Sequence, residues 1–121
     1  MNKHEIPHHQ WAPFLENFSL EHSGKMVSVK CRLPERGVII EAESKRLEAL
    51  IQESVQGFER IAIILGQSTE LPQTHFVSCP KQIRLRVTLD GGEEGVEIEA
   101  DDGRTVIVQI SAMAKFEIEA A

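Results

Sequence analysis

The sequence predicts a mainly β domain of the α+β class, in which an antiparallel meander sheet curls into a roll or small barrel closed by one N-terminal amphipathic helix. Two observations carry this prediction. Apolar residues near the N-terminus recur at the spacing of one helical face, and from Lys25 onward the apolar pattern alternates with period two. Short turns separate the alternating stretches, which is typical of sheets built from strands that are neighbours in the chain.

The helix is expected from four apolar side chains at positions i, i+3, i+4 and i+7, namely Trp11, Phe14, Leu15 and Phe18. This spacing places them on one amphipathic face. Pro13 fits near the first helical position, so we expect a short turn from Pro7 and then a helix over about 12–22. Gly24 is a natural left-handed residue after the end of that helix.

Two strands are expected next, joined by a four-residue turn from Pro34 to Gly37. The first strand buries alternate side chains, namely Val27, Val29, Cys31 and Leu33. The turn is expected to pair Leu33 with Val38, Cys31 with Ile40 and Val29 with Ala42, all apolar on one face. The following segment, 43–57, stays open between a short helix ended by Gly57 and a strand that turns back through Gln56-Gly57.

The second half is expected to contain only strands. A central strand covers 58–65, a short one covers 74–79 and ends at Pro80, and a third covers 82–89 with Leu89 pointing inward. We expect Leu89 to lie opposite Val96, Val87 opposite Ile98, and Arg86 opposite Glu99. A final hairpin with Gly103 in a left-handed bulge pairs Ile98 with Val106 and Val96 with Val108.

A chain of 121 residues is expected to form a single domain. It divides into the helix at about 7–22, the β meander at about 25–111 and a tail at 112–121. The tail alternates Phe116, Ile118 and Ala120, which favours an edge strand or a strand that pairs with another chain.

Composition argues against several classes of function. The net charge is −6, and no apolar run approaches the length that spans a bilayer. Neither nucleic acid nor a membrane is therefore an expected partner. The polar opening lacks the apolar core of a signal peptide, so the expected compartment is the cytoplasm.

The residue types that build metal and catalytic sites lack the required spacing. Cys31 and Cys79 form no Cys-x-x-Cys pair and are expected to be buried thiols on inward strand faces. His4 and His8 are four apart, but Pro7 lies between them and a third ligand is missing. The chain also has no nucleophile elbow and no glycine-rich phosphate loop before a helix, so catalytic residues stay unknown and neither a metal nor a cofactor is expected.

Two features stay as candidates for function. His22 and His75, with Trp11, are expected to line a cleft between the helix and the sheet. The stretch from Asp90 to Asp102 holds seven acidic residues and no basic one. We interpret it as a solvated hairpin partly neutralised by arginines, with a basic protein partner as the alternative; the arginines are Arg84, Arg86 and Arg104.

The N-terminal framework Ile6-Pro7-x-x-x-Trp11-x-x-Phe14-Leu15-x-x-Phe18-Ser19-x-x-His22-x-Gly24 resembles the opening of a family of small bacterial proteins catalogued only as a domain of unknown function. Ile61-x-Ile63-x-Leu65-Gly66 and Val96-x-Ile98-x-x-x-x-Gly103 match it further along the chain. The resemblance implies a bacterial, stand-alone domain and favours strand-turn-strand over 49–65. It brings no activity, cofactor or catalytic residue.

Two hypotheses for function follow. The first is a non-enzymatic accessory or protein-interaction module that self-associates as a homodimer. The alternative is a small-molecule-binding or enzymatic domain that uses a cleft between the N-terminal helix and the sheet.

Overall fold

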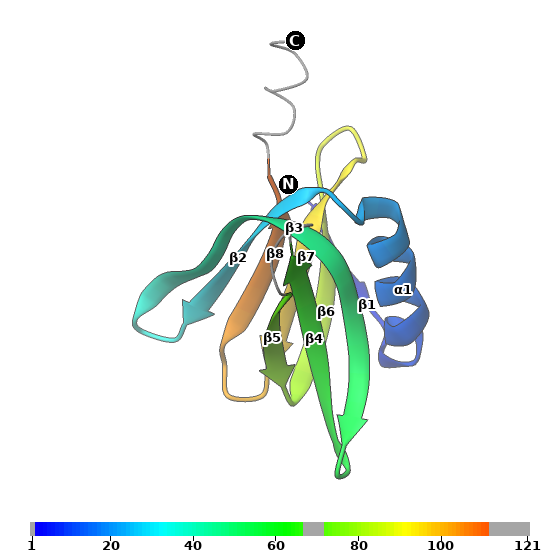
Figure 1. Cartoon of the computed structure of the whole chain (residues 1–121). Coiled ribbons are helices and arrows are strands. Elements are labelled where there is room, and N and C mark those ends of the chain that lie inside the picture. Colours follow the sequence, from blue (N-terminus) through cyan, green and yellow to red (C-terminus); the bar gives the residue numbers. More distant parts are fainter. Residues whose placement is uncertain (1, 67–71, 112–121) are drawn as a thin grey trace.

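The computed structural model describes residues 2–66 and 72–111, and in them one α-helix packs on an eight-stranded antiparallel sheet (Figure 1). The expected mainly β class with an N-terminal helix is confirmed. In chain order the elements are β1 (Asn2–Ile6), a 3-10 turn η1 (His8–Gln10), α1 (Trp11–His22), β2 (Met26–Leu33), β3 (Gly37–Val55), β4 (Phe58–Gly66), β5 (Gln73–Ser78), β6 (Pro80–Val87), β7 (Glu93–Ala100) and β8 (Thr105–Ile110).

The strand order is β1-β6-β7-β8-β2-β3-β4-β5. Two meanders, β6–β7–β8 and β2–β3–β4–β5, are joined by antiparallel pairing between β8 and β2. Within residues 2–66 and 72–111, β1 and β5 form the two ends of the sheet and do not pair with each other. The sheet is strongly twisted (Figure 1), but the strand pairing does not close it into the expected barrel.

The helix forms where its apolar spacing predicts it. η1 precedes it, α1 then runs over Trp11–His22, and Gly24 follows with φ +87°. Trp11, Leu15 and Phe18 are buried in one cluster with sheet residues that include Leu47 and Leu50 of β3. The aromatic face therefore covers the sheet, as an amphipathic helix is expected to do.

The segment 43–57, for which a helix and a strand were both open, forms a strand up to Val55. The segment belongs to β3, which pairs with β2 through its first half and with β4 through its second. Gln56 and Gly57 form the turn to β4, both at positive φ (+51° and +83°), as a tight hairpin turn requires.

The pairing of β2 with β3 differs from the expected register. Leu33 lies opposite Gly37 and Cys31 opposite Ile39, whereas Val29 does lie opposite Ala42 as expected. The loop has three residues instead of four because its central residue adopts a left-handed conformation, and an irregularity beside Val29 then restores the register. A bulge of this kind inserts one extra residue into one strand.

The pairing of β6 with β7 also differs from expectation. β6 ends at Val87, and Leu89 lies in the following turn with 89% of its surface exposed. Leu85 therefore lies opposite Val96, and Ile83 opposite Ile98. The expected pairs that involved Leu89, Val87 and Arg86 were wrong because the turn begins two residues earlier, at Thr88, whose N–H donates to the Gly92 carbonyl at 2.8 Å.

The last hairpin is confirmed in register. Ile98 lies opposite Val106 and Val96 opposite Val108, with Gly103 at φ +92° in the turn. The apolar match on both strands was sufficient to choose between two loop lengths that differ by one residue.

Two further features were not anticipated, and one lies outside the described part of the chain. β1 pairs with β6 along one end of the sheet. Cys31 is buried as expected, but Cys79 is only half-buried, at a one-residue corner between β5 and β6 where φ is +52°. The expected tail strand at 112–121 falls outside the described residues.

No helix among the described residues has the length and apolarity to cross a membrane.

Replacing Trp11 by Ala is predicted to lower the free energy of unfolding by about 3–5 kcal/mol. The ring is 2% exposed and its Nε1–H donates to the Ile6 carbonyl at 2.9 Å, so truncation leaves both a cavity and an unpaired acceptor. Urea denaturation measures the change. Phe58→Ala is the control because that ring is 67% exposed, and it should change the free energy by no more than about 0.5 kcal/mol. Similar values for both variants would contradict the role of α1 as a structural lid.

Candidate functional site

The three residues of the expected cleft do not meet. Trp11 begins α1 and His22 ends it, so eleven residues at 1.5 Å each place them about 16 Å apart along the axis. Trp11 is core, and its ring contacts the His8 ring at a centroid distance of 4.4 Å. His75 lies on β5, where its Nδ1 is 3.4 Å from Oε2 of Glu41.

His22 is nearly buried at the C-terminal end of α1. Its ring contacts the Phe18 ring at a centroid distance of 4.5 Å, and 7% of the residue's surface is exposed. Its Nε2 lies 2.6 Å from Oε1 of Glu93, and its Nδ1 lies 3.0 Å from Nζ of Lys25. The ring therefore connects the helix end to the start of β7 through Nε2, and to Lys25, which precedes β2, through Nδ1.

A metal could in principle be held here, because one ligand atom each from Glu21, His22 and Glu93 all lie within 4.8 Å of one another. The hydrogen bonds argue against that use. The Lys25 ammonium can only donate hydrogen bonds, so Nδ1 of His22 accepts one from it. Nε2 then carries the ring proton and donates a hydrogen bond to Glu93. A metal at Nε2 would require the proton on Nδ1, against the ammonium. The arrangement fits a Lys–His–Glu hydrogen-bonded chain better than a metal centre.

A groove lies between α1 and β3, with a volume of about 440 Å³. It is a cleft between the helix and the sheet, as the alternative hypothesis requires, but it is lined by other residues than those expected. Ser19 fixes its floor, since the Ser19 hydroxyl donates to the Leu15 carbonyl at 2.7 Å and accepts the Leu50 N–H at 2.8 Å. The lining residues are Ala12, Glu16, Ser19, Leu20, Ser23, Glu48, Ala49, Leu50, Ile51 and Gln52.

Helix and strand run in opposite directions along this groove. Ser19 bonds to Leu50, whereas Gly24, just beyond the end of the helix, donates its N–H to the carbonyl of Leu47 at 2.8 Å. Ala12 and Glu16 therefore lie toward the end that holds Gln52, and Ser23 lies toward the end that holds Glu48, whose carboxylate leans across Gly66 of β4. The sequence offered a signal for the helix side of this groove, the small residues Ala12, Ser19 and Ser23 on one stripe, but none for the strand side.

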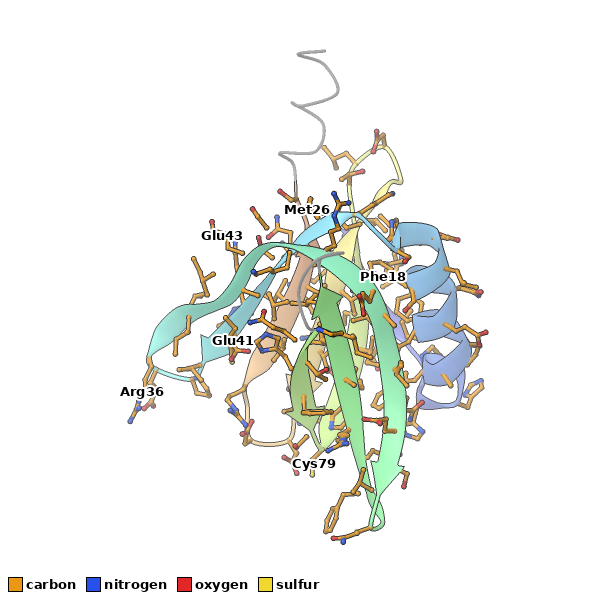
Figure 2. The ribbon with its side chains drawn as sticks, in the orientation of Figure 1. Phe18, Met26, Arg36, Glu41, Glu43 and Cys79 are labelled. Carbon is orange, nitrogen blue, oxygen red and sulfur yellow. The ribbon has the colours of Figure 1, made fainter. Side chains whose placement is uncertain are left out.

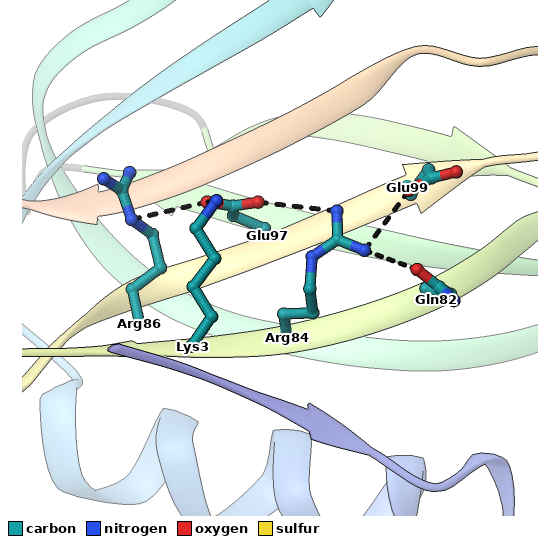
Figure 3. Close-up of polar contacts among 6 residues, drawn as sticks. All are labelled: Lys3, Gln82, Arg84, Arg86, Glu97 and Glu99. Atoms are coloured by element: carbon teal, nitrogen blue, oxygen red, sulfur yellow. Dashed lines mark hydrogen bonds and ion pairs between the residues drawn. The ribbon is translucent and has the colours of Figure 1, made fainter. Parts of the chain in front are cut away.

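A buried carboxylate organises the charges on β6 and β7 (Figure 3). Glu97 of β7 is fully buried, and ion pairs join it to Lys3 (3.0 Å), Arg86 (3.4 Å) and Arg84 (3.5 Å). Burial alone would raise the pKa of Glu97. The hydrogen bond and charge of Lys3, with the charges of Arg86 and Arg84, outweigh that effect and hold the pKa of Glu97 below its ordinary value.

Arginines neutralise part of the acidic stretch, as expected, but Glu97 is buried and not solvated. Arg84 also contacts Glu99 at 3.2 Å, and Arg104 contacts Asp102 at 2.8 Å. Arg84 and Arg86 of β6 are engaged with carboxylates of β7 rather than gathered into a phosphate-binding surface. Comparison of the chain with protein-family models, with curated proteins and with solved structures finds no match. The resemblance to a family of unknown function stays a prediction.

Acid should weaken the fold through Glu97. Because the pKa of this carboxyl is lowered from 4.5 by folding, its contribution is complete above the unfolded value and is lost as pH falls through the folded value. Glu97→Gln is predicted to lower the free energy of unfolding at pH 7 by roughly 3 kcal/mol. It should also flatten the decline in stability between about pH 5 and pH 3.

Urea denaturation across this pH range checks the prediction. Glu94→Gln removes a neighbouring carboxyl outside the ion-pair cluster drawn in Figure 3 and serves as the control. A Glu97→Gln protein whose acid sensitivity matches that of wild type would contradict this account of the cluster.

Proposed function

We propose that this chain is a non-enzymatic accessory or protein-interaction module that self-associates through the β2–β3 arm, defined as residues 33–43. Figure 1 shows the tip of this hairpin projecting from the sheet on the side opposite α1. In Figure 2 the arm carries Arg36 at its tip, with Glu41 and Glu43 further along β3. The observation that carries the proposal is an apolar strand edge on this arm.

Three consecutive apolar side chains of the arm face solvent. Val38, Ile39 and Ile40 are 55%, 50% and 55% exposed. Within residues 2–66 and 72–111, this half of β3 pairs with β2 along one edge, and no strand pairs with its other edge, since β4 begins to pair only at Arg46. An exposed, apolar edge is a template for pairing with another strand.

A second copy fits this edge in one register. Two identical antiparallel strands related by a two-fold axis place one residue opposite its own copy. Centring on Ile40 puts Ile40 against Ile40 and Val38 against Ala42, all apolar. It also places Arg36 of each copy opposite Ser44 of the other and Glu41 opposite Ile39, so no two like charges lie directly opposite each other.

The neighbouring registers are less favourable. Centring on Glu41 would place two carboxylates directly opposite each other. Centring on Ile39 would place Glu35 against Glu43. Like charges across a sheet are destabilising, so charge selects the register that is centred on Ile40.

The proposed setting is the bacterial cytoplasm. The resemblance supports a bacterial source, and the two cysteines, Cys31 and Cys79, are both free thiols, as suits a reducing compartment. The non-enzymatic role is supported by the way the chemically active side chains are used. His22 and Glu97, for example, serve as hydrogen-bonded and ion-paired links between elements.

Light scattering coupled to size-exclusion chromatography tests the proposal. Wild-type protein is expected to form a dimer that dissociates on dilution, and Ile40→Lys is expected to be monomeric at every concentration, because it places two like charges face to face. Leu89→Lys adds the same charge at another exposed apolar site and should leave the dimer intact.

A chain truncated at Ala112 separates the arm from the tail, which lies outside the described residues. The arm predicts that the truncated protein still dimerises. A wild-type protein that is monomeric at high concentration, or an Ile40→Lys variant that dimerises like wild type, would refute self-association through the arm.

A second function is favoured by the α1–β3 groove. Its volume of about 440 Å³ falls in the range of small-molecule sites. We propose small-molecule binding there as the alternative role.

A further inference from the structure

The second half of β3 turns unpaired backbone groups toward the helix that runs beside it (Figure 1). Leu50 directs its N–H and its carbonyl toward α1, where the Ser19 hydroxyl bonds to both. Because backbone groups alternate between the two edges of a strand, Gln52 and Ser54 direct theirs to the same side. No hydrogen bond among the described residues joins α1 to β3 beyond Leu50. The α1–β3 groove therefore contains an unpaired strand edge that begins at Gln52.

The walls of the groove are apolar where this edge begins. Leu20 lines it from the helix and is 73% exposed, and Ile51 lines it from β3 and is 44% exposed. An extended peptide can satisfy both features at once. Its main chain adds to the strand edge through hydrogen bonds, while alternate side chains cover apolar surface.

The chain itself enters this region directly after β8. The Ser111 N–H donates to the Met26 carbonyl at 2.8 Å, and Met26 lies opposite Arg46 of β3. Since β8 and β3 both run antiparallel to β2, the chain leaves Ser111 in the sense in which β3 continues past Arg46. Two strand spacings across the sheet and six residues along β3 place Gln52 about 22 Å from Ser111.

The tail, residues 112–121, lies outside the described part of the chain, but its length and sequence suit the groove. Its residues reach about 33 Å when extended, which exceeds the distance from Ser111 to Gln52. The seventh of them, Ile118, reaches about 23 Å. An extended strand turns alternate side chains to one side, and here an apolar set alternates with a charged set: Phe116, Ile118 and Ala120 against Lys115, Glu117 and Glu119.

We propose that the tail binds in the α1–β3 groove of its own chain, as a strand added to the free edge of β3 with Ile118 beside Gln52. Its apolar side chains cover Leu20 and Ile51, and its charged side chains face solvent. The proposal concerns a different surface from the β2–β3 arm and does not depend on self-association. The tail is then a competitor for any small molecule that the groove binds.

Amide hydrogen exchange of the full chain tests the proposal at the Gln52 N–H, which points to the free edge. In wild-type protein this amide is expected to exchange slowly at every protein concentration, because a tail in the same molecule covers it. The Leu50 N–H, which bonds to Ser19, should be slow in every variant and serves as the internal reference. A Gln52 N–H that exchanges as fast as an unpaired amide in wild-type protein would overturn the proposal.

Three variants assign the contacts. Ile118→Lys should speed exchange at Gln52 by about tenfold or more, since losing one buried apolar side chain shifts the bound population by such a factor. Leu20→Lys should do the same from the side of the groove and leave the urea midpoint unchanged, because Leu20 is largely exposed. Glu117→Lys introduces the same side chain on the solvent face of the tail and should change nothing.

The remaining outcomes separate this proposal from self-association. Ile40→Lys, the variant expected to be monomeric, should keep Gln52 protected. Protection that rises with protein concentration, or that is lost in Ile40→Lys, would place a second copy in the groove and overturn the intramolecular proposal while self-association stands. Equal protection of Gln52 in wild type and Ile118→Lys would also overturn it, since something other than the tail would then cover the edge.

Discussion

The structure depends on how β3 shares its two edges. This strand runs over nineteen residues, Gly37–Val55, and pairs with β2 through its first half and with β4 through its second. Each half therefore has one edge without a neighbouring strand among the described residues. Backbone groups on such an edge need other partners. The helix supplies them for part of the second half, where Ser19 accepts the Leu50 N–H. The first half is left with exposed apolar side chains.

Both proposed functions follow from this division. The edge that α1 partly covers becomes the floor of the α1–β3 groove, and the edge with which no described strand pairs belongs to the β2–β3 arm. Register irregularities occur in both halves, and they allow one long strand to change neighbours along its length. The aromatic face of α1 packs against the second half of β3. The packing of the helix and the α1–β3 groove are therefore consequences of one interface.

The sequence predicted the elements whose two faces differ sharply. Trp11 and Phe18 specified the helix, and Ile98 with Val106 specified the register of the last hairpin, because a slip would have turned apolar side chains outward. Where a one-residue or four-residue shift kept an apolar match, the register was mispredicted, as at Leu33 and Leu89. Local turn conformations decided these cases, and left-handed non-glycine residues such as Glu35 (φ +64°) leave little trace in a sequence.

The candidate site was the least predictable part. His22 and His75 attracted attention because histidine carries so much chemistry, yet each is engaged with a carboxylate on a different part of the fold. The groove had no comparable marker in the sequence, and only the antiparallel packing of α1 on β3 brings Ser19 to Leu50 at its floor. β1 was missed because its residues lack the alternation that marks a half-buried strand.

Amide hydrogen exchange along β3, measured at low and high protein concentration, tests the central claim about its two edges most directly. In the arm, every second amide points to the edge that no described strand covers. The account predicts that the amides at 38–43 that point to this edge gain protection as concentration rises, whereas those at 47–53 are equally protected throughout. If the edge-facing amides at 38–43 exchange slowly at low concentration, or if their exchange does not change with concentration, the account is contradicted.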